Sequence, residues 1–162
     1  MHAGHCGDGT VYRGYSSGTV AGTVRSNYSP TNGAQTACDC AFFGILGPSL
    51  VTTSVLVNGN GKFAYTNNNT AIIGDMACHT GAASYEDLGS INNDTDGIDN
   101  NDVGRGTETL VNAVRFNTSS QGGDSGASVG DGGSFLGIIA GGGGGVVIAS
   151  SSQHFGAYAP TF

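Results

Sequence analysis

The chain has 162 residues, enough for one domain with a substantial core. Its formal net charge is −7 with only five lysine and arginine residues, which argues against a nucleic-acid partner because phosphate binding needs cations. No apolar run approaches the roughly 20 residues that cross a bilayer, so no membrane span is expected. The scarcity of lysine and the abundance of glycine, serine, threonine and asparagine are typical of an extracellular protein.

Glycine, at 30 residues, and the many valines and threonines favour strands and turns over helices. Turn residues recur about every ten positions between short β-branched runs. One short helix is predicted over 151–158, "SSQHFGAY", where the leading serines are suitable caps. The pattern predicts an all-β sandwich or barrel with strands over 10–15, 18–25, 38–45, 51–57, 62–66, 71–77, 108–117, 134–140 and 145–149.

The four cysteines are Cys6, Cys38, Cys40 and Cys78. They lack the paired C-x2-C knuckles of a zinc ribbon, which disfavours a structural zinc site. If the protein is secreted, one disulfide from Cys6 to Cys38 or Cys40 is expected.

The segment "NNDTDGIDNND", residues 92–102, concentrates carboxylates. Its spacing repeats positions 1, 3, 5 and 6 of an EF-type calcium loop, but position 12 would be Val103 rather than a bidentate acid. A structural calcium site and a solvated hairpin tip are therefore both open. The carboxylates of the calcium alternative would come from Asp94, Asp96, Asp99 and Asp102.

The glycine-rich run "SQGGDSGA", residues 120–127, places a serine in a tight turn. A serine hydroxyl is a weak nucleophile, so it needs a base within hydrogen-bond reach and a group that orients the base. It also needs donors that face the developing oxyanion. The backbone N–H groups of Gly123 and Ser125 can converge on one point, which predicts an oxyanion hole.

Two upstream residues can act as partners of Ser125. His5 lies in "AGHCG", and Asp39 lies in the strand-like "ACDCAFFGI". The order His5, Asp39, Ser125 is that of the chymotrypsin triad. We therefore predict that His5 is the general base and that Asp39 orients it.

Five segments, in chain order, carry a resemblance to a known family. They are "HAGHCG", "CDCAFFGI", "GDMACHTGAASYEDLGSI", "RFNTSSQGGDSGASV" and "FLGIIAGGGGGVVIASSSQHF". They resemble the T-A-G-H-C segment, the D-x-A strand, the V-C-K-S-G-R-T-T-G-x-x-x-G-x-I segment, the nucleophile loop and the closing strands of chymotrypsin-like serine proteases, in the bacterial streptogrisin and α-lytic branch. The resemblance covers nearly the whole chain.

The resemblance implies a chymotrypsin-like double β-barrel with an incomplete first barrel and a short C-terminal helix. Residues 1–66 would form the first barrel, with His5 and Asp39, and residues 67–162 the second, with Ser125. The implied activity is that of a secreted, monomeric serine endopeptidase that cleaves polypeptides through an acyl-enzyme intermediate and requires no cofactor.

The same resemblance places Ser119 at the floor of the primary specificity pocket. Ala140, Gly141 and Gly142 would line one wall. No acid lies at the floor, so we expect apolar or aromatic side chains to be preferred over lysine or arginine.

The chain departs from the family pattern in four places. Only four residues precede His5, where family members have opening strands, so we expect the chain to be a fragment. His79 stands in place of a basic residue, which predicts a His79–Asp124 pair that supports the nucleophile loop; a surface histidine is the alternative. Ala140 replaces a serine that supports the triad aspartate, and Ala127 replaces a glycine.

Other readings of these residues lead to different proteins. A nucleophile elbow needs an acid and a histidine after the serine, and only Asp131 and His154 are available. The order Asp39, His79, Ser125 is that of subtilisin, whose helices this composition does not favour. Two non-enzymatic functions remain: a catalytically inactive protease-like binding module, and a calcium-stiffened extracellular surface domain.

Overall fold

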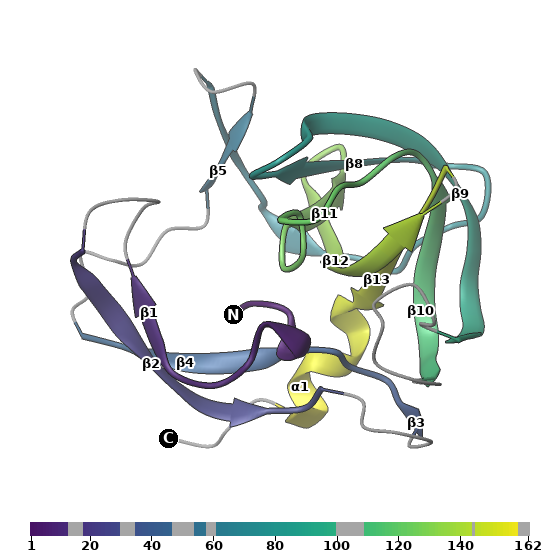
Figure 1. Ribbon diagram of the computed structural model, residues 1–162. Helices are drawn as coiled ribbons and strands as arrows, with labels where there is room; N and C mark the ends of the chain where they lie inside the picture. The colour runs from purple at the N-terminus through teal and green to yellow at the C-terminus, as the bar shows by residue number, and fades with distance from the viewer. Residues whose placement is uncertain are drawn as a thin grey trace.

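The computed structural model describes residues 1–12, 18–29, 35–46, 54–57, 61–99, 109–143 and 145–158. Strands dominate these ranges, as the composition predicts. Figure 1 shows a smaller and a larger curled sheet, with the C-terminal helical segment next to both. Within the described ranges, no helix is long and apolar enough to cross a membrane.

The smaller sheet carries the N-terminal part of the chain. It is antiparallel, in the order β1-β2-β4, and follows a single 3-10 turn, η1 (Gly4–Cys6). Among the described residues its edge strands are β1 and β4, and beyond β4 only the isolated bridge between His2 and Ala41 adds a pairing, in agreement with the expected incomplete first barrel. A separate hairpin pairs β5 with β6. The strands of these two units are β1 (Thr10–Tyr12), β2 (Val20–Asn27), β4 (Ala41–Ile45), β5 (Ser54–Val57) and β6 (Gly61–Ala64).

The larger sheet closes on itself. Its strand order is β11-β8-β9-β10-β13-β12-β7, and β11 also pairs with β12, so β8 to β13 form a six-stranded ring. Closure removes exposed strand edges, which is how all-β domains avoid edge-to-edge association. The strands are β7 (Asn67–Asn68), β8 (Met76–Gly81), β9 (Tyr85–Asp99), β10 (Thr109–Asn117), β11 (Ser128–Asp131), β12 (Ser134–Gly143) and β13 (Val146–Ser151).

The main core belongs to this ring. Side chains alternate between the two faces of a strand, so Val114 and Phe116 of β10 and Val147 and Ala149 of β13 belong to the same apolar cluster. Burying these side chains is the main favourable term for the fold. The cluster consists of Ala71, Ala77, Val114, Phe116, Val129, Leu136, Ile139, Val147 and Ala149.

Two features join the small sheet to the ring. The short strand β3 (Gln35–Thr36) pairs in parallel with β10. The predicted terminal helix forms as η4 (Ser152–His154) and α1 (Phe155–Tyr158), and the Ser151 hydroxyl caps it by accepting from the Gln153 N–H. A second apolar cluster includes Cys38, Cys40, Ile138 and Phe155, with Tyr28, Phe42, Phe135 and Tyr158 packed against it.

Three predicted elements differ clearly from the structure. The strand expected over 38–45 begins only at Ala41. The strand expected over 71–77 begins only at Met76, because residues 72–75 form a turn in which Gly74 has φ +98°. The aspartate segment expected as a loop instead continues strand β9 through Asp99, where pairing with β10 outweighs the low strand propensity of Asn and Asp. Asp102 lies outside the described residues. The division of barrels at 66/67 stays a prediction.

Candidate active site

The structure brings His5, Asp39 and Ser125 together. His5 Nδ1 lies 2.5 Å from Asp39 Oδ2, and His5 Nε2 lies 2.7 Å from Ser125 Oγ. An ionised carboxylate only accepts hydrogen bonds, so Nδ1 carries the hydrogen and the neutral ring leaves Nε2 to accept from the Ser125 hydroxyl. The imidazole thus joins an acid to a hydroxyl in the arrangement that nucleophilic catalysis requires.

Glycines allow the histidine segment to approach both partners. His5 lies in η1, and the His5 backbone N–H donates a hydrogen bond of 2.8 Å to Asp39 Oδ1. A Cβ at Gly4 would lie 2.9 Å from the same carboxylate oxygen. A Cβ at Gly126, where φ is +83°, would lie 2.9 Å from the N of Ala3. Side chains at these two positions would therefore push His5 away from Asp39 and Ser125.

Asp39 is buried, at 1% exposure, and its surroundings correct one expectation and add one contact. The disulfide links Cys38 to Cys40 rather than either of them to Cys6, which keeps an exposed thiol. The Ser150 hydroxyl accepts from the Asp39 N–H at 2.9 Å. A serine on β13 thus holds the aspartate backbone, a role for which the sequence contained no signal.

The electrostatics of His5 favour its charged form. The hydrogen bond to Asp39 is the largest cause, and a contact with Cys6 adds to it; together they outweigh burial and raise the pKa of His5 to about 9. Two acceptor-bearing neighbours therefore stabilise the imidazolium that forms when a serine proton is transferred. The same interaction means that the neutral base is fully populated only in alkaline solution.

The nucleophile loop places two backbone donors beside Ser125. Gly123 has φ +110°, a conformation that side chains disfavour. The Asp124 N–H, which lies between these two residues in the sequence, donates to the Gln121 carbonyl oxygen at 3.0 Å. By contrast, the N–H groups of Gly123 and Ser125 meet no acceptor among the residues that the structure describes. These two donors are therefore available to an external oxygen.

Asp124 and His79 both support the loop, but not as the predicted pair. The Asp124 carboxylate is buried and accepts from the N–H groups of Gln121 (2.8 Å), Ala83 (2.9 Å) and Ser84 (3.0 Å). Burial would raise the pKa of Asp124, but these hydrogen bonds outweigh it and lower the pKa. With its lone pairs satisfied by N–H groups, the carboxylate needs no histidine partner.

His79 is neither a surface residue nor a partner of Asp124. It is fully buried, its Nε2 lies 2.9 Å from the carbonyl oxygen of Ser119, and its ring packs edge-on against Phe116. Since a carbonyl only accepts, Nε2 carries the hydrogen. The contact joins β8 to the start of the nucleophile loop.

The structure also places the residues predicted to line the primary specificity pocket. Ser119 precedes the nucleophile loop, and Gly142 on β12 lies close to Ser120, because a Cβ at Gly142 would meet the Ser120 hydroxyl. Ala140 is fully buried and Gly141 half-buried on the same strand. The pocket assignment itself stays a prediction.

Within the described residues the histidine that contacts Ser125 is His5, not His79 or His154 of the alternative hypotheses. His154 lies in η4, and Asp131 ends β11. For the calcium alternative, the backbone of Asp94, Asp96 and Asp99 is extended in β9, not curled into a loop. Among the described ranges no cluster of three or more His, Cys, Asp or Glu side chains could hold a metal ion.

Comparison with known proteins gives the class of fold. No protein-family model matches the chain, and no curated protein matches it. Among solved structures, a glutamic acid-specific serine protease superposes with a TM-score of 0.82 at 23% identity, over 97% of this chain and 82% of that one. Thermobifida fusca protease A gives 0.77 at 24% identity, over 97% and 79%. Cellulomonas bogoriensis chymotrypsin gives 0.77 at 22%, over 97% and 81%.

The chain thus has the chymotrypsin-like β-barrel fold. More narrowly, it is similar in structure to bacterial serine proteases of that fold, as the sequence resemblance predicts.

Proposed function

We propose that this protein is a serine endopeptidase that uses Ser125, His5 and Asp39 as a triad. The observation that carries the proposal is the position of one imidazole ring between an acid and a hydroxyl, 2.5 Å from Asp39 and 2.7 Å from Ser125. His5 is 34 positions from Asp39 and 120 positions from Ser125 in the sequence. Their convergence therefore depends on the fold and not on local sequence.

In the acylation step, His5 Nε2 removes the Ser125 hydroxyl proton while Oγ attacks the carbonyl carbon of the peptide bond. The negative charge that develops on the carbonyl oxygen is stabilised by the N–H groups of Gly123 and Ser125. Asp39 stabilises the imidazolium and fixes its orientation. The C–N bond then breaks as His5 returns the proton to the leaving amine, and Ser125 holds the acyl group as an ester.

In the deacylation step, the same residues act on water. Neutral His5 removes a proton from water, and the hydroxide attacks the ester carbonyl. The oxyanion again faces Gly123 and Ser125. Breakdown of this intermediate releases the carboxylic acid, and the proton returns from His5 to Ser125 Oγ.

The remaining features of the proposal follow the resemblance. The substrate is a polypeptide, with apolar or aromatic side chains preferred at the pocket of Ser119, Ala140, Gly141 and Gly142. The protein acts outside the cell as a monomer, and no step above requires a cofactor.

A fluorophosphonate probe tests this function. It should label Ser125 and fail on Ser125→Ala, while Ser134→Ala, on β12, should be labelled like the wild type. Hydrolysis of a denatured protein substrate should fall by about 10⁴-fold or more in Ser125→Ala. A folded wild-type protein that neither reacts with the probe nor cleaves peptides would instead favour the catalytically inactive binding module.

A further inference from the structure

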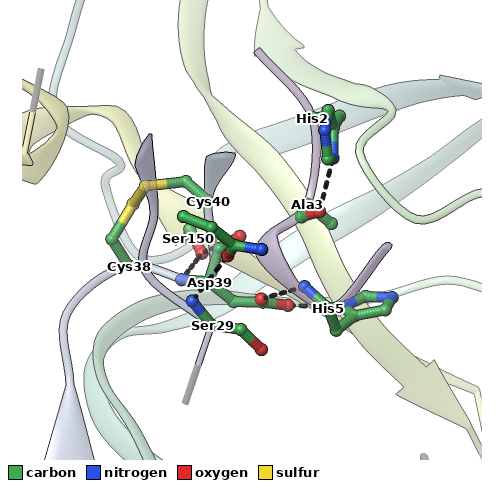
Figure 2. Close-up of a disulfide and its surroundings, with 9 residues drawn as sticks. His2, Ala3, His5, Ser29, Cys38, Asp39, Cys40 and Ser150 are labelled. Atoms are coloured by element: carbon green, nitrogen blue, oxygen red, sulfur yellow. Dashed lines mark hydrogen bonds and ion pairs between the residues drawn. A yellow bond between two sulfur atoms is a disulfide. The ribbon is translucent and has the colours of Figure 1, made fainter. Parts of the chain in front are cut away.

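Asp39 lies inside the small covalent ring that the Cys38–Cys40 disulfide closes. Cys38 and Cys40 flank it, their Cα atoms are 5.2 Å apart, and both side chains are fully buried. Figure 2 shows the sulfur–sulfur bond on the side of Asp39 opposite to His5. The covalent ring therefore includes the whole backbone of the aspartate.

Further contacts hold the same residue. The Asp39 N–H donates to Ser150 Oγ at 2.9 Å, and this hydroxyl also lies 3.5 Å from the Asp39 carbonyl oxygen (Figure 2). On the other side, the carboxylate accepts from the backbone N–H and from Nδ1 of His5. Backbone and side chain are thus fixed from opposite directions.

The disulfide contributes little to global stability through chain entropy. In the chain-entropy model, the gain from a cross-link grows with the number of residues in the closed loop, and this loop is among the shortest available. Its main effect must be local. Because the cysteines pack with Ile138 of β12 and Phe155 of α1, the ring is also anchored to the sheet that carries Ser125.

We propose that the Cys38–Cys40 disulfide is a positioning device for the triad, which holds the Asp39 backbone so that its carboxylate stays directed at His5. The inference rests on the proposed function of the triad. It assigns a role to two buried cysteines that are not members of the triad.

Opening the disulfide should therefore reduce activity reversibly. A dithiol such as dithiothreitol transfers two electrons to the S–S bond, so Cys38 and Cys40 become thiols while the reductant closes to its own cyclic disulfide. Asp39 then keeps only its hydrogen bonds, and its carboxylate can rotate away from His5 Nδ1.

The first measurement is the pKa of His5 by NMR, with His5→Gln to identify the resonance. In Cys38→Ala/Cys40→Ala we expect this pKa to fall from about 9 toward 6.5, because the hydrogen bond to Asp39 is its largest cause. The value of kcat/KM should fall about tenfold or more, since misplaced catalytic groups are costly, with the loss in kcat rather than KM. Cys78→Ser, which alters a cysteine outside the disulfide, should leave both unchanged.

Two results would overturn the inference. One is a folded double variant in which the His5 pKa and kcat/KM equal those of the wild type. The other is alkylation of all four cysteines in unreduced, denatured protein, since only Cys6 and Cys78 should react. The titration needs no turnover, so it stays decisive even when Ser125 fails to react and the proposed function falls.

If the double variant does not fold, the same test is made by reducing the wild-type protein. Reduction with dithiothreitol should lower the His5 pKa and the labelling rate of Ser125, and reoxidation should restore both. A reduced, folded protein with an unaltered His5 pKa contradicts the proposal.

Discussion

The carboxylate of Asp124 accepts a hydrogen bond from the backbone N–H of Ala83 at 2.9 Å, which ties the nucleophile loop to the turn between β8 and β9. Gly81 leaves the space for it, because a Cβ there would collide with the Asp124 carboxylate. The residue next to the nucleophile is thus held by a neighbouring hairpin through the backbone N–H groups of Ala83 and Ser84.

Replacing Asp124 with Asn should lower both stability and activity. The amide carries two N–H donors, so one of them would face the Gln121 or Ala83 N–H in place of an acceptor. Leaving a buried donor unsatisfied costs about 1–3 kcal/mol, which a denaturant titration measures. Labelling of Ser125 should slow as the loop loosens. An unchanged midpoint and labelling rate would show that the three hydrogen bonds do not hold the loop.

Stability at low pH should depend on the same carboxylate. The pKa of Asp124 is lowered on folding, so its contribution is present above the unfolded pKa, 3.8, and is lost as the pH falls through the folded pKa. Between neutral pH and strong acid, the wild type should therefore lose more free energy of unfolding than Asp124→Asn does. Parallel stability curves for the two proteins would contradict this.

The activity should rise through alkaline pH. The pKa of His5 is raised to about 9, and catalysis needs the neutral base, so kcat/KM should fall about tenfold for each pH unit well below that value. The same raised pKa makes protonated His5 stabilise the folded state. This stabilisation is complete below the unfolded pKa, 6.5, and is lost as the pH rises through about 9.

Cys6 should take part in this pH dependence. Because its contact with His5 is the second cause of the raised pKa, Cys6→Ala should move the pH–rate profile to lower pH by part of the shift. Cys78→Ser is the matched control and should leave the profile in place. An identical profile for Cys6→Ala would show that Asp39 alone sets the pKa of His5.

Ser150→Ala should loosen the backbone of Asp39 and so lower both stability and activity. It leaves the buried Asp39 N–H without its 2.9 Å acceptor, at a cost of about 1–3 kcal/mol in the free energy of unfolding. A shift of Asp39 should also lower kcat about tenfold. Ser134→Ala, on the neighbouring strand β12, serves as the control. Full activity in Ser150→Ala would assign the positioning of Asp39 to the disulfide and His5 alone.

His79 should be replaceable by a residue that keeps the donor. His79→Gln can still donate to the Ser119 carbonyl, whereas His79→Leu cannot and should lose about 1 kcal/mol or more of stability. The two variants have similar size, so denaturant midpoints isolate the hydrogen bond. Equal midpoints would mean that packing against Phe116 is what matters.

Calcium binding by Asp94, Asp96, Asp99 and Asp102 stays a proposal. Bound calcium would stabilise the folded state by mass action, so the melting temperature should rise with calcium and fall with a chelator. Asp94→Asn/Asp96→Asn should abolish the rise. A melting temperature that ignores calcium removes the metal from consideration.

The sequence predicted the residues of the candidate site better than the contacts between them. The chemistry and chain order of His5, Asp39 and Ser125 suit nucleophilic catalysis, and both properties are visible in the sequence. The His79–Asp124 pair was wrong because charge complementarity does not reveal that backbone N–H groups already satisfy a carboxylate.

Elements whose propensity agrees with their environment were also predictable. The Val- and Ile-rich strands β12 and β13 and the terminal helical segment, whose first turn η4 is capped by Ser151, are examples. Strand β9 was missed because its Asn, Asp and Gly residues favour turns, and only pairing with β8 and β10 makes it extended. Ser150 was missed for a similar reason, since it contacts a residue 111 positions away.

Strand β3 has only two residues, yet it connects unfolding of the large sheet to the position of Asp39. Thr36 pairs with Leu110 of the ring, and only Ala37 separates it from Cys38 and so from Asp39. Thermal opening of the six-stranded β-ring would therefore also release the segment that leads to Asp39. Under the proposed function, a partly unfolded molecule would then lack the group that orients its general base.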